Sequence, residues 1–173
     1  MILASSAILK GIKKGEIEIT PFDIKRLNPN SYNLSLHNVL YLLAPGQLDM
    51  RKKSAYEEIE IPETGYLLEP GKLYLGRTVE YTKTYKHVPL LEGRSSIGRL
   101  GIFIHATAGF GDVGFCGYWT LEISVIQPVV IYPFAEICQI YYHEVKGKAM
   151  EYHGKYQNNT GIQTSGIYQE LKK

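Results

Sequence analysis

From residue 65 onward the sequence is a succession of short apolar runs, each ended by glycine or proline, and this pattern constrains the fold most. The runs are rich in β-branched and aromatic residues, which favour strands. The clearest are GYLLEPG, KLYLGRTVEYTKTY, GIFIHATAG, YWTLEISVI, PVVIYPF and EICQIYYHEV. Many short strands at close spacing predict a mainly β protein, built as a sandwich or as a closed barrel.

The residues before this region predict one helix and further strands. SSAILKGIKKG places three apolar residues on one face, which predicts a short helix capped by Ser5 or Ser6 and ended by Gly15. In NPNSYNLSLHNVLYLL apolar and polar residues alternate, which predicts a strand. Residues 49–63 are expected to form an exposed charged segment that runs into a short strand.

The end of the chain differs in composition from the rest. From about residue 152 to residue 173 it is polar and rich in Gly, Asn, Gln and Thr, which predicts a mobile arm outside the core. A chain of 173 residues without an internal repeat favours a single domain. We therefore expect one domain over residues 1–173, with the arm at its end.

The overall composition argues against several classes of protein. The formal net charge is only +2, so no general field favours nucleic acid or a membrane surface. Cys116 and Cys138 lie far apart in the sequence, which excludes a disulfide framework and fits a reducing compartment. The N-terminal lysines follow the apolar patch, unlike those of a signal peptide, and prolines and acids interrupt the most apolar region. We expect a cytoplasmic protein.

Residues 92–101, EGRSSIGRLG, combine two arginines, two adjacent serines and three glycines. Guanidinium groups and hydroxyls suit the oxygens of an anion such as phosphate, and Arg fits these oxygens better than Lys. Glycines let the backbone approach the same anion closely. The stretch therefore predicts a local anion-binding site.

Two other candidate sites are not supported. GKLYLGRT, residues 71–78, partly matches a phosphate-binding loop, but its apolar residues favour a strand. A zinc-dependent nucleobase deaminase needs an H-x-E motif and a pair of cysteines, and none of the five histidines begins such a motif.

Two acidic residues stand in informative surroundings. GFGDVGFCG surrounds Asp112 with glycines, which indicates either a tight turn or a close approach to a ligand. In YWTLEISVI, alternation places Thr120 and Glu122 on the face opposite Leu121. Glu122 therefore faces solvent or lines a pocket, and its small polar neighbours favour a pocket in which a carboxylate can transfer protons.

The run EGRSSIGRLGIFIHATAGFGDVGFCGYWTLEISV resembles the dCTP deaminase branch of the dCTP deaminase/dUTPase superfamily. NPNSYNLSL and GKYQNN extend the resemblance over nearly the whole chain. The resemblance implies a distorted, jelly-roll-like β-barrel of the dUTPase type, with a short N-terminal helix and a flexible C-terminal arm. It also implies a homotrimer whose active sites are shared between neighbouring subunits.

The activity implied by the resemblance is the hydrolytic deamination of dCTP to dUTP and ammonia, in the synthesis of dUTP and dTTP. No zinc is implied, Mg²⁺ is expected on the triphosphate, and dTTP is a possible feedback ligand. Glu122 would be the proton shuttle, with Ser95, Arg99 and the carbonyl of Ala108 around the attacking water. The residues implied to bind the nucleotide are Arg94, Ser95, Ser96, Ile97, Gly98, Arg99, Asp112, Thr120, Leu121, Glu122, Gln139, Tyr152, Lys155 and Asn159.

These residues would meet different parts of dCTP. The segment 94–99 would meet the triphosphate, Asp112 the 3′-hydroxyl, and residues 120–122 the base. Gln139 would lie near the nucleotide, and the arm residues would close over it.

The sequence departs from the family's usual pattern at three positions, and it leaves alternatives open. Asn33 stands where many relatives have Asp, Phe134 where they have Gly, and Asn159 where they have Gln. One alternative is a bifunctional enzyme that also hydrolyses the triphosphate and releases dUMP and diphosphate. A second is a nucleotide-binding regulator without catalysis. A simple dUTPase is disfavoured, because its glycine-rich C-terminal arm is missing.

Overall fold

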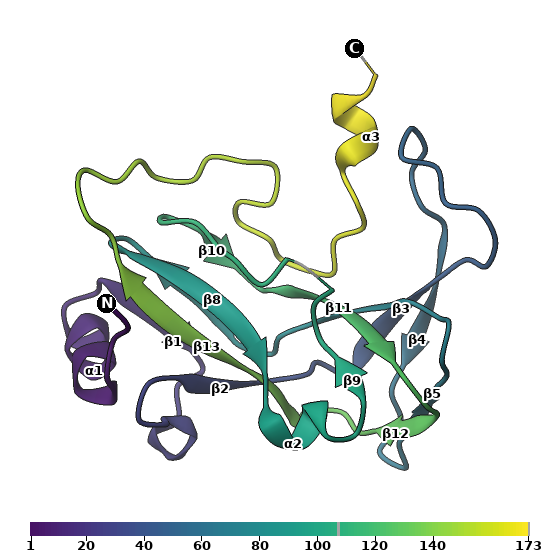
Figure 1. Ribbon diagram of the computed structural model, residues 1–173, viewed down its shortest axis with the longest axis horizontal. Coiled ribbons are helices and arrows are strands. Elements are labelled where there is room, and N and C mark those ends of the chain that lie inside the picture. Colours follow the sequence, from purple (N-terminus) through teal and green to yellow (C-terminus); the bar gives the residue numbers. More distant parts are fainter. Residues whose placement is uncertain (107, 173) are drawn as a thin grey trace.

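The computed structural model describes residues 1–106 and 108–172 and confirms a mainly β protein (Figure 1). In chain order the elements are α1 (Ser5–Lys13), β1 (Ile17–Thr20), a 3-10 turn (Ile24–Arg26), β2 (Tyr32–Ser35), β3 (Val39–Leu43), β4 (Tyr56–Glu60), β5 (Tyr66–Leu68), β6 (Tyr74–Arg77), β7 (Tyr81–Thr84), β8 (His87–Gly93), α2 (Ser95–Gly98), β9 (Ile102–Phe103), β10 (Cys116–Gly117), β11 (Thr120–Val125), β12 (Val129–Ile131), β13 (Glu136–Glu144) and α3 (Ile167–Glu170).

The strands pair antiparallel in four small sheets. The largest has the order β4-β3-β6-β11-β9, and the others are β1-β7-β10, β2-β13-β8 and β12-β5. Figure 1 shows α2 at one end of the long strands β8 and β13. The C-terminal segment, residues 152–172, crosses the opposite side of the molecule. Within the described residues, no helix is long and apolar enough to cross a bilayer.

The centre of the largest sheet supplies much of the hydrophobic core. In β11, Leu121 and Ile123 have no exposed surface, and alternate residues are only partly buried. They pack in one cluster with residues of the other sheets, including Tyr74 of β6 and Ile140 of β13. This burial fixes which face of β11 points away from the core.

The N-cap of the N-terminal helix lies one residue before the two predicted serines, and the helix begins at Ser5. Ala4 is the N-cap of α1 and provides no side-chain bond, so the predicted Ser5 or Ser6 cap is wrong. The reason lies outside the helix, because the Ser5 amide donates a 2.7 Å hydrogen bond to the Pro29 carbonyl. The predicted end is close, since Lys14 is the C-cap and Gly15 follows with φ 67°.

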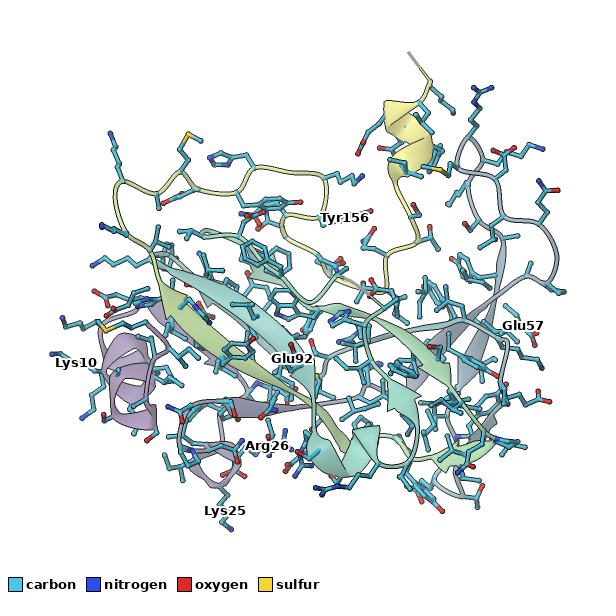
Figure 2. The ribbon with its side chains drawn as sticks, viewed as in Figure 1. Lys10, Lys25, Arg26, Glu57, Glu92 and Tyr156 are labelled. Atoms are coloured by element: carbon cyan, nitrogen blue, oxygen red, sulfur yellow. The ribbon has the colours of Figure 1, made fainter. Side chains whose placement is uncertain are left out.

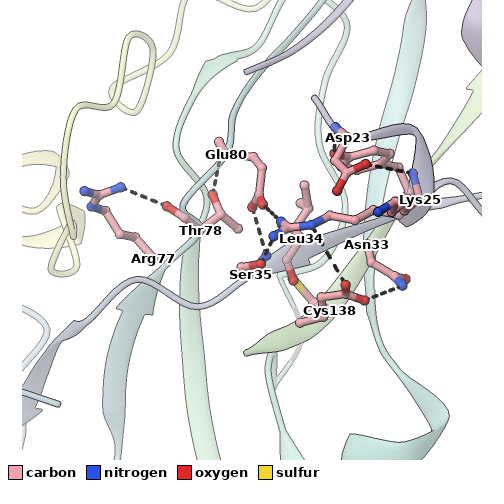
Figure 3. A network of polar contacts seen from close by, with 12 residues as sticks. Asp23, Lys25, Asn33, Leu34, Ser35, Arg77, Thr78, Glu80 and Cys138 are labelled. Atoms are coloured by element: carbon pink, nitrogen blue, oxygen red, sulfur yellow. Dashed lines mark hydrogen bonds and ion pairs between the residues drawn. The ribbon is translucent and has the colours of Figure 1, made fainter. Parts of the chain in front are cut away.

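The predicted strand near residue 32 contains buried polar residues. It divides into β2 and β3, and Asn33 and Ser35 of β2 are buried although alternation predicts an outward direction. Ser35 belongs to the polar network of Figure 3, where its amide donates to Glu80 over 2.8 Å. Its hydroxyl accepts a 2.8 Å bond from Arg26, which also pairs with Glu80. A buried polar group is tolerated when it is hydrogen-bonded in this way.

Six of the described elements are absent from the sequence prediction. These are β1, the 3-10 turn, β8, α2, β10 and α3. β8 carries Pro89, which argues against a central strand, but it lies at the edge of the β2-β13-β8 sheet, where proline is tolerated. The predicted strand at residues 71–78 is confirmed as β6, so GKLYLGRT is not a phosphate-binding loop.

Trp119 joins two of the sheets just before β11 begins. Its indole nitrogen donates a 2.8 Å hydrogen bond to the Thr82 hydroxyl on β7, and both side chains are buried. We predict that Thr82→Val, which keeps the shape but removes the acceptor, lowers the free energy of unfolding by about 1–3 kcal/mol. Urea denaturation measures this as a lower midpoint with an unchanged slope.

The control is the same change in a Trp119→Phe background, which has no indole donor. There Thr82→Val should cost about 0.5 kcal/mol or less. An equal cost in both backgrounds would contradict the role given to this hydrogen bond.

Candidate active site

A cavity of about 560 Å³ lies between the largest sheet, the loop that contains Asp112 and the C-terminal segment. This volume is in the usual range for small-molecule sites. Leucines and aromatic residues make up about half of the lining, together with several polar groups. The lining residues are Leu43, Leu48, Ser54, Leu73, Leu75, Ala108, Phe110, Gly111, Asp112, Phe115, Tyr118, Trp119, Thr120, Glu122, Tyr152, Tyr156, Asn159, Gln163, Thr164 and Ser165.

β11 places two predicted residues on the cavity wall. Thr120 and Glu122 line the cavity because the alternate residues of the strand are buried in the core. The predicted alternation is therefore confirmed. The side chain of Leu121 lies in the core with no exposed surface, so only its main chain can face a ligand at this wall.

Glu122 has a partner that the sequence did not indicate. Its Oε2 lies 2.6 Å from Nδ1 of His105, whose side chain is only 7% exposed. The other ring nitrogen of His105 is buried and has no hydrogen-bond partner among the described residues. If Nδ1 carries the hydrogen, the imidazole donates to the carboxylate and fixes its orientation. No recognised motif spacing joins positions 105 and 122, so pattern analysis missed the contact.

The loop around Asp112 forms the predicted tight turn and also lines the cavity, while its close approach to a ligand stays a prediction. The main-chain carbonyl of Asp112 accepts a 3.2 Å hydrogen bond from the Phe115 amide, which closes a turn. Asp112 is itself exposed and lines the cavity. Glycine is required beside it, since a Cβ on Gly111 would lie 2.5 Å from Trp119. Gly114 has φ 87°, a conformation that favours glycine, and a Cβ there would meet the backbone of the C-terminal segment.

The C-terminal segment is held against the sheet and does not lie wholly outside the core. Asn159 is 5% exposed, and Gly117 and Asn159 form a parallel bridge. The Tyr118 amide donates to the Asn159 carbonyl over 3.0 Å, and the Asn159 side chain donates to the Tyr118 carbonyl over 2.8 Å. Tyr156, labelled in Figure 2, belongs to this segment and lines the cavity.

The same segment reaches Thr120 on the cavity wall. The Gln163 amide donates a 3.0 Å bond to the Thr120 hydroxyl, and the Gln163 side chain donates to Asn159 over 3.0 Å. Tyr152 also lines the cavity, whereas Lys155 lines an adjoining pocket of about 290 Å³ and pairs with Glu170. Sequence analysis missed Tyr156 and Gln163, which lie in a stretch without strand or helix periodicity.

The other predicted residues lie away from this cavity. Ser95, Ser96, Ile97 and Gly98 form α2, with Arg94 before it and Arg99 after it, and none of them lines the cavity. The Gln139 side chain on β13 accepts a 2.8 Å bond from Ser31 and donates a 3.5 Å bond to the Gly93 carbonyl, beside Arg94. α2 lies on the side of the molecule opposite the C-terminal segment (Figure 1).

A single chain thus divides the predicted site into two groups. Ala108, Asp112, Thr120, Glu122, Tyr152 and Asn159 line the cavity, and residues 94–99 with Gln139 form the second group. The first group offers a partly apolar cavity with a carboxylate in its wall. The second group offers exposed hydroxyls and guanidinium groups.

Comparisons with known proteins place the chain in a family. The family model described as dCTP deaminase-like matches residues 2–145, and the chain belongs to this family. A protein of Clostridium beijerinckii named "dCTP deaminase, dUMP-forming" is 60% identical over 174 residues, which cover all of both chains. A protein of the same name from Cytophaga hutchinsonii is 56% identical over 99% of this chain and 100% of the relative.

A solved structure supports the fold. The 2′-deoxycytidine 5′-triphosphate deaminase of Agrobacterium tumefaciens superposes with a TM-score of 0.66 at 22% identity. The match covers 83% of this chain and 48% of the solved chain, so this chain spans about half the length of that protein. The similarity confirms the predicted fold type.

The names of the relatives correct one expectation. A deaminase that stops at dUTP was the activity implied first by the sequence resemblance, and it is wrong. The Clostridium, Cytophaga and Hathewaya relatives, the last 58% identical, are all named dUMP-forming. These names favour the bifunctional alternative. The residues quoted for the resemblance do not by themselves separate the two activities.

We predict that Asn159→Ala releases the C-terminal segment from the sheet. The change removes a buried amide that bonds to the Tyr118 carbonyl and to Gln163, while the main chain is unaltered. Losing about 1–3 kcal/mol of local stability should speed tryptic cleavage after Lys155 about tenfold. The exposed neighbour Thr160→Ala is the matched control and should leave cleavage unchanged. Equal rates in both variants would show that Asn159 does not hold the segment.

Proposed function

We propose that this chain converts dCTP and two waters to dUMP, diphosphate and ammonia. The observation that carries the proposal is the position of Glu122, a carboxylate on the wall of a largely apolar cavity, in a chain 60% identical over its full length to a protein named dUMP-forming. Apolar walls suit a pyrimidine and its deoxyribose, and the few polar groups fix their orientation.

In the deamination step, Glu122 would act as the proton shuttle. It would accept a proton from the water that attacks C4 of the cytosine and pass it to N3. The proton of the new C4 hydroxyl would then pass to the amino group, which leaves as ammonia while the C4 carbonyl forms. His105, at 2.6 Å from the carboxylate, would keep it in one orientation. A second water would then cleave the bond between the α- and β-phosphates, which yields dUMP and diphosphate.

We propose that Mg²⁺ enters with the nucleotide and is bound through its phosphates, because Mg²⁺ commonly takes substrate phosphates and water as ligands. Within the described residues, no three His, Cys, Asp or Glu side chains converge as a metal site. Inhibition by dTTP stays a prediction from the family resemblance. The two cysteines are unpaired and buried, which agrees with the reducing cytoplasm that we propose for the protein.

We propose further that the active site is completed between subunits of a homotrimer. The division of the predicted residues supports this, since the group at α2 lies apart from the cavity in one chain. In the assembly, α2 of one subunit would bring Ser95 and Arg99 to the cavity of its neighbour. Symmetric oligomers commonly build sites from two subunits in this manner.

The first test is an incubation of the purified protein with dCTP and Mg²⁺. We expect dUMP, diphosphate and ammonia in equal amounts, separated by ion exchange and measured against time. Accumulation of dUTP with ammonia would contradict the second hydrolysis. Unchanged dCTP, with binding shown by calorimetry, would favour the regulator that lost catalysis.

A second test addresses Glu122 and the shared site together. Glu122→Gln should lose at least about 10² in turnover while it still binds dCTP, because the amide cannot accept a proton. Arg99→Ala should also lose activity. When the two inactive variants are unfolded, mixed and refolded, about a third of the sites in mixed trimers should have both native residues and regain activity.

No regain of activity in trimers shown to be mixed would contradict the shared site without affecting the proposed reaction. Near-normal turnover of Glu122→Gln would remove Glu122 from its role.

A further inference from the structure

Arg94, at the start of α2, is held by one residue of β13. Its Nη1 donates a 2.9 Å hydrogen bond to the main-chain carbonyl of Glu136 and lies 3.2 Å from Oε2 of the same residue. The side chains of both residues are about one third exposed, at 34% and 32%. Nη1 is thus engaged on two sides, whereas Nε and Nη2 of Arg94 make no hydrogen bond to the described residues and stay available to an anion.

Glu136 is itself held by residues deeper in the fold. Its Oε2 accepts a 2.8 Å bond from the amide of Asn33, and its Oε1 lies 3.9 Å from Nε of Arg26. Arg26 pairs in turn with Glu80, which has no exposed surface. Figure 3 shows Asn33, Ser35 and Glu80 in this network. A continuous set of polar contacts therefore runs from a fully buried carboxylate to the arginine at the surface.

The identity of residue 33 matches this arrangement. The Asn33 amide has two roles, since its oxygen accepts a 2.7 Å bond from Asn28 while its nitrogen donates to Glu136. An aspartate could take the first role but not the second. It would place a second carboxylate 2.8 Å from Glu136, and two carboxylates at that distance do not both ionise without a large cost.

We propose that Glu136 is a positioning residue for the nucleotide triphosphate: it fixes the Arg94 guanidinium in the orientation that binds phosphate oxygens, and Asn33 is matched to it. The inference rests on the proposed function, because it takes dCTP as the ligand. Fixing a long side chain before binding removes an entropy cost that binding would otherwise carry.

The negative charge of Glu136 would by itself change the affinity for phosphate in the opposite direction. Glu136 also lowers the positive charge around Arg94, so its neutralisation would strengthen phosphate binding if net charge alone were important. The two accounts therefore predict opposite changes in affinity.

The experiment compares the KM for dCTP, kcat and competitive inhibition by inorganic triphosphate in a set of variants. Glu136→Gln should raise both the KM and the inhibition constant of triphosphate about three- to tenfold, with kcat within about twofold of wild type. Arg94→Ala should raise the same two constants at least as much. Glu57→Gln, an exposed acid on the edge strand β4, is the matched control and should change neither.

A swap separates positioning from a general structural role. Asn33→Asp alone should weaken binding, because it brings two carboxylates together. The double variant Asn33→Asp with Glu136→Gln keeps one charge and one amide and only reverses the donor, since the new glutamine amide can donate to the new aspartate. The glutamine amide nitrogen then takes the place of Oε2, which Arg94 also contacts, so Arg94 loses this acceptor. We expect the double variant to recover the stability lost in Asn33→Asp, while its KM stays about as high as that of Glu136→Gln.

Several outcomes would overturn the inference. These are an unchanged or lower KM in Glu136→Gln, an unchanged KM in Arg94→Ala, or a double variant with the KM of wild type. A wild-type protein that leaves dCTP unchanged would instead refute the proposed function, so the two failures are distinct. Thermal melting of each variant shows whether a change in KM comes from loss of the folded state.

Discussion

The candidate active site depends on the burial of one face of β11. Leu121 and Ile123 are completely buried between the sheets, and this burial directs Thr120 and Glu122 to the cavity. A shift of the pairing by one residue would exchange the two faces and place the carboxylate in the core. Pairing with β6 on one side and β9 on the other secures the register. The side chain proposed for catalysis is thus positioned by its apolar neighbours in the sequence.

The second group of residues is positioned by polar contacts. Glu136 lies between Arg94 and Arg26, and Arg26 also pairs with Glu80. Glu80 has no exposed surface. Burial raises the pKa of the Glu80 carboxyl, and the bond from Ser35 and the charge of Arg26 offset part of this rise. Placing a charge in the interior is costly, and breaking such a pair is costlier. These contacts give α2 a fixed base from which exposed side chains can meet a ligand.

The parts of the site that sequence analysis predicted are those with a regular local pattern. The alternation of β11 was sufficient to place Glu122 opposite Leu121, and the glycine spacing was sufficient to predict the turn at Asp112. The contact of His105 with Glu122 could not be predicted, because it depends on the path by which the chain from residue 105 comes back to lie beside residue 122. Asn33 and Ser35 were misassigned for a related reason. Alternation predicts that polar residues face solvent. Asn33 and Ser35 are buried instead, because they bond to Arg26, Glu80 and Glu136, which come from distant segments. The bridge between Asn159 and Gly117 of β10 likewise could not be predicted, because it joins segments about 40 residues apart in the sequence.

A physical reason explains why the motifs do not distinguish dUTP from dUMP as the product. In the proposed reaction both hydrolyses act on one bound nucleotide, and dUTP differs from dCTP only at C4 and N3. Residues that hold the sugar and the phosphates therefore hold the intermediate as well as the substrate. The product is then decided by a competition of rates, between release of dUTP and attack of the second water. In this proposal the C-terminal segment would affect the first rate. Asn159 and Gln163 join it to Thr120 on the cavity wall, and product release commonly requires such a segment to open. A segment that opens slowly favours the second hydrolysis without any new catalytic residue.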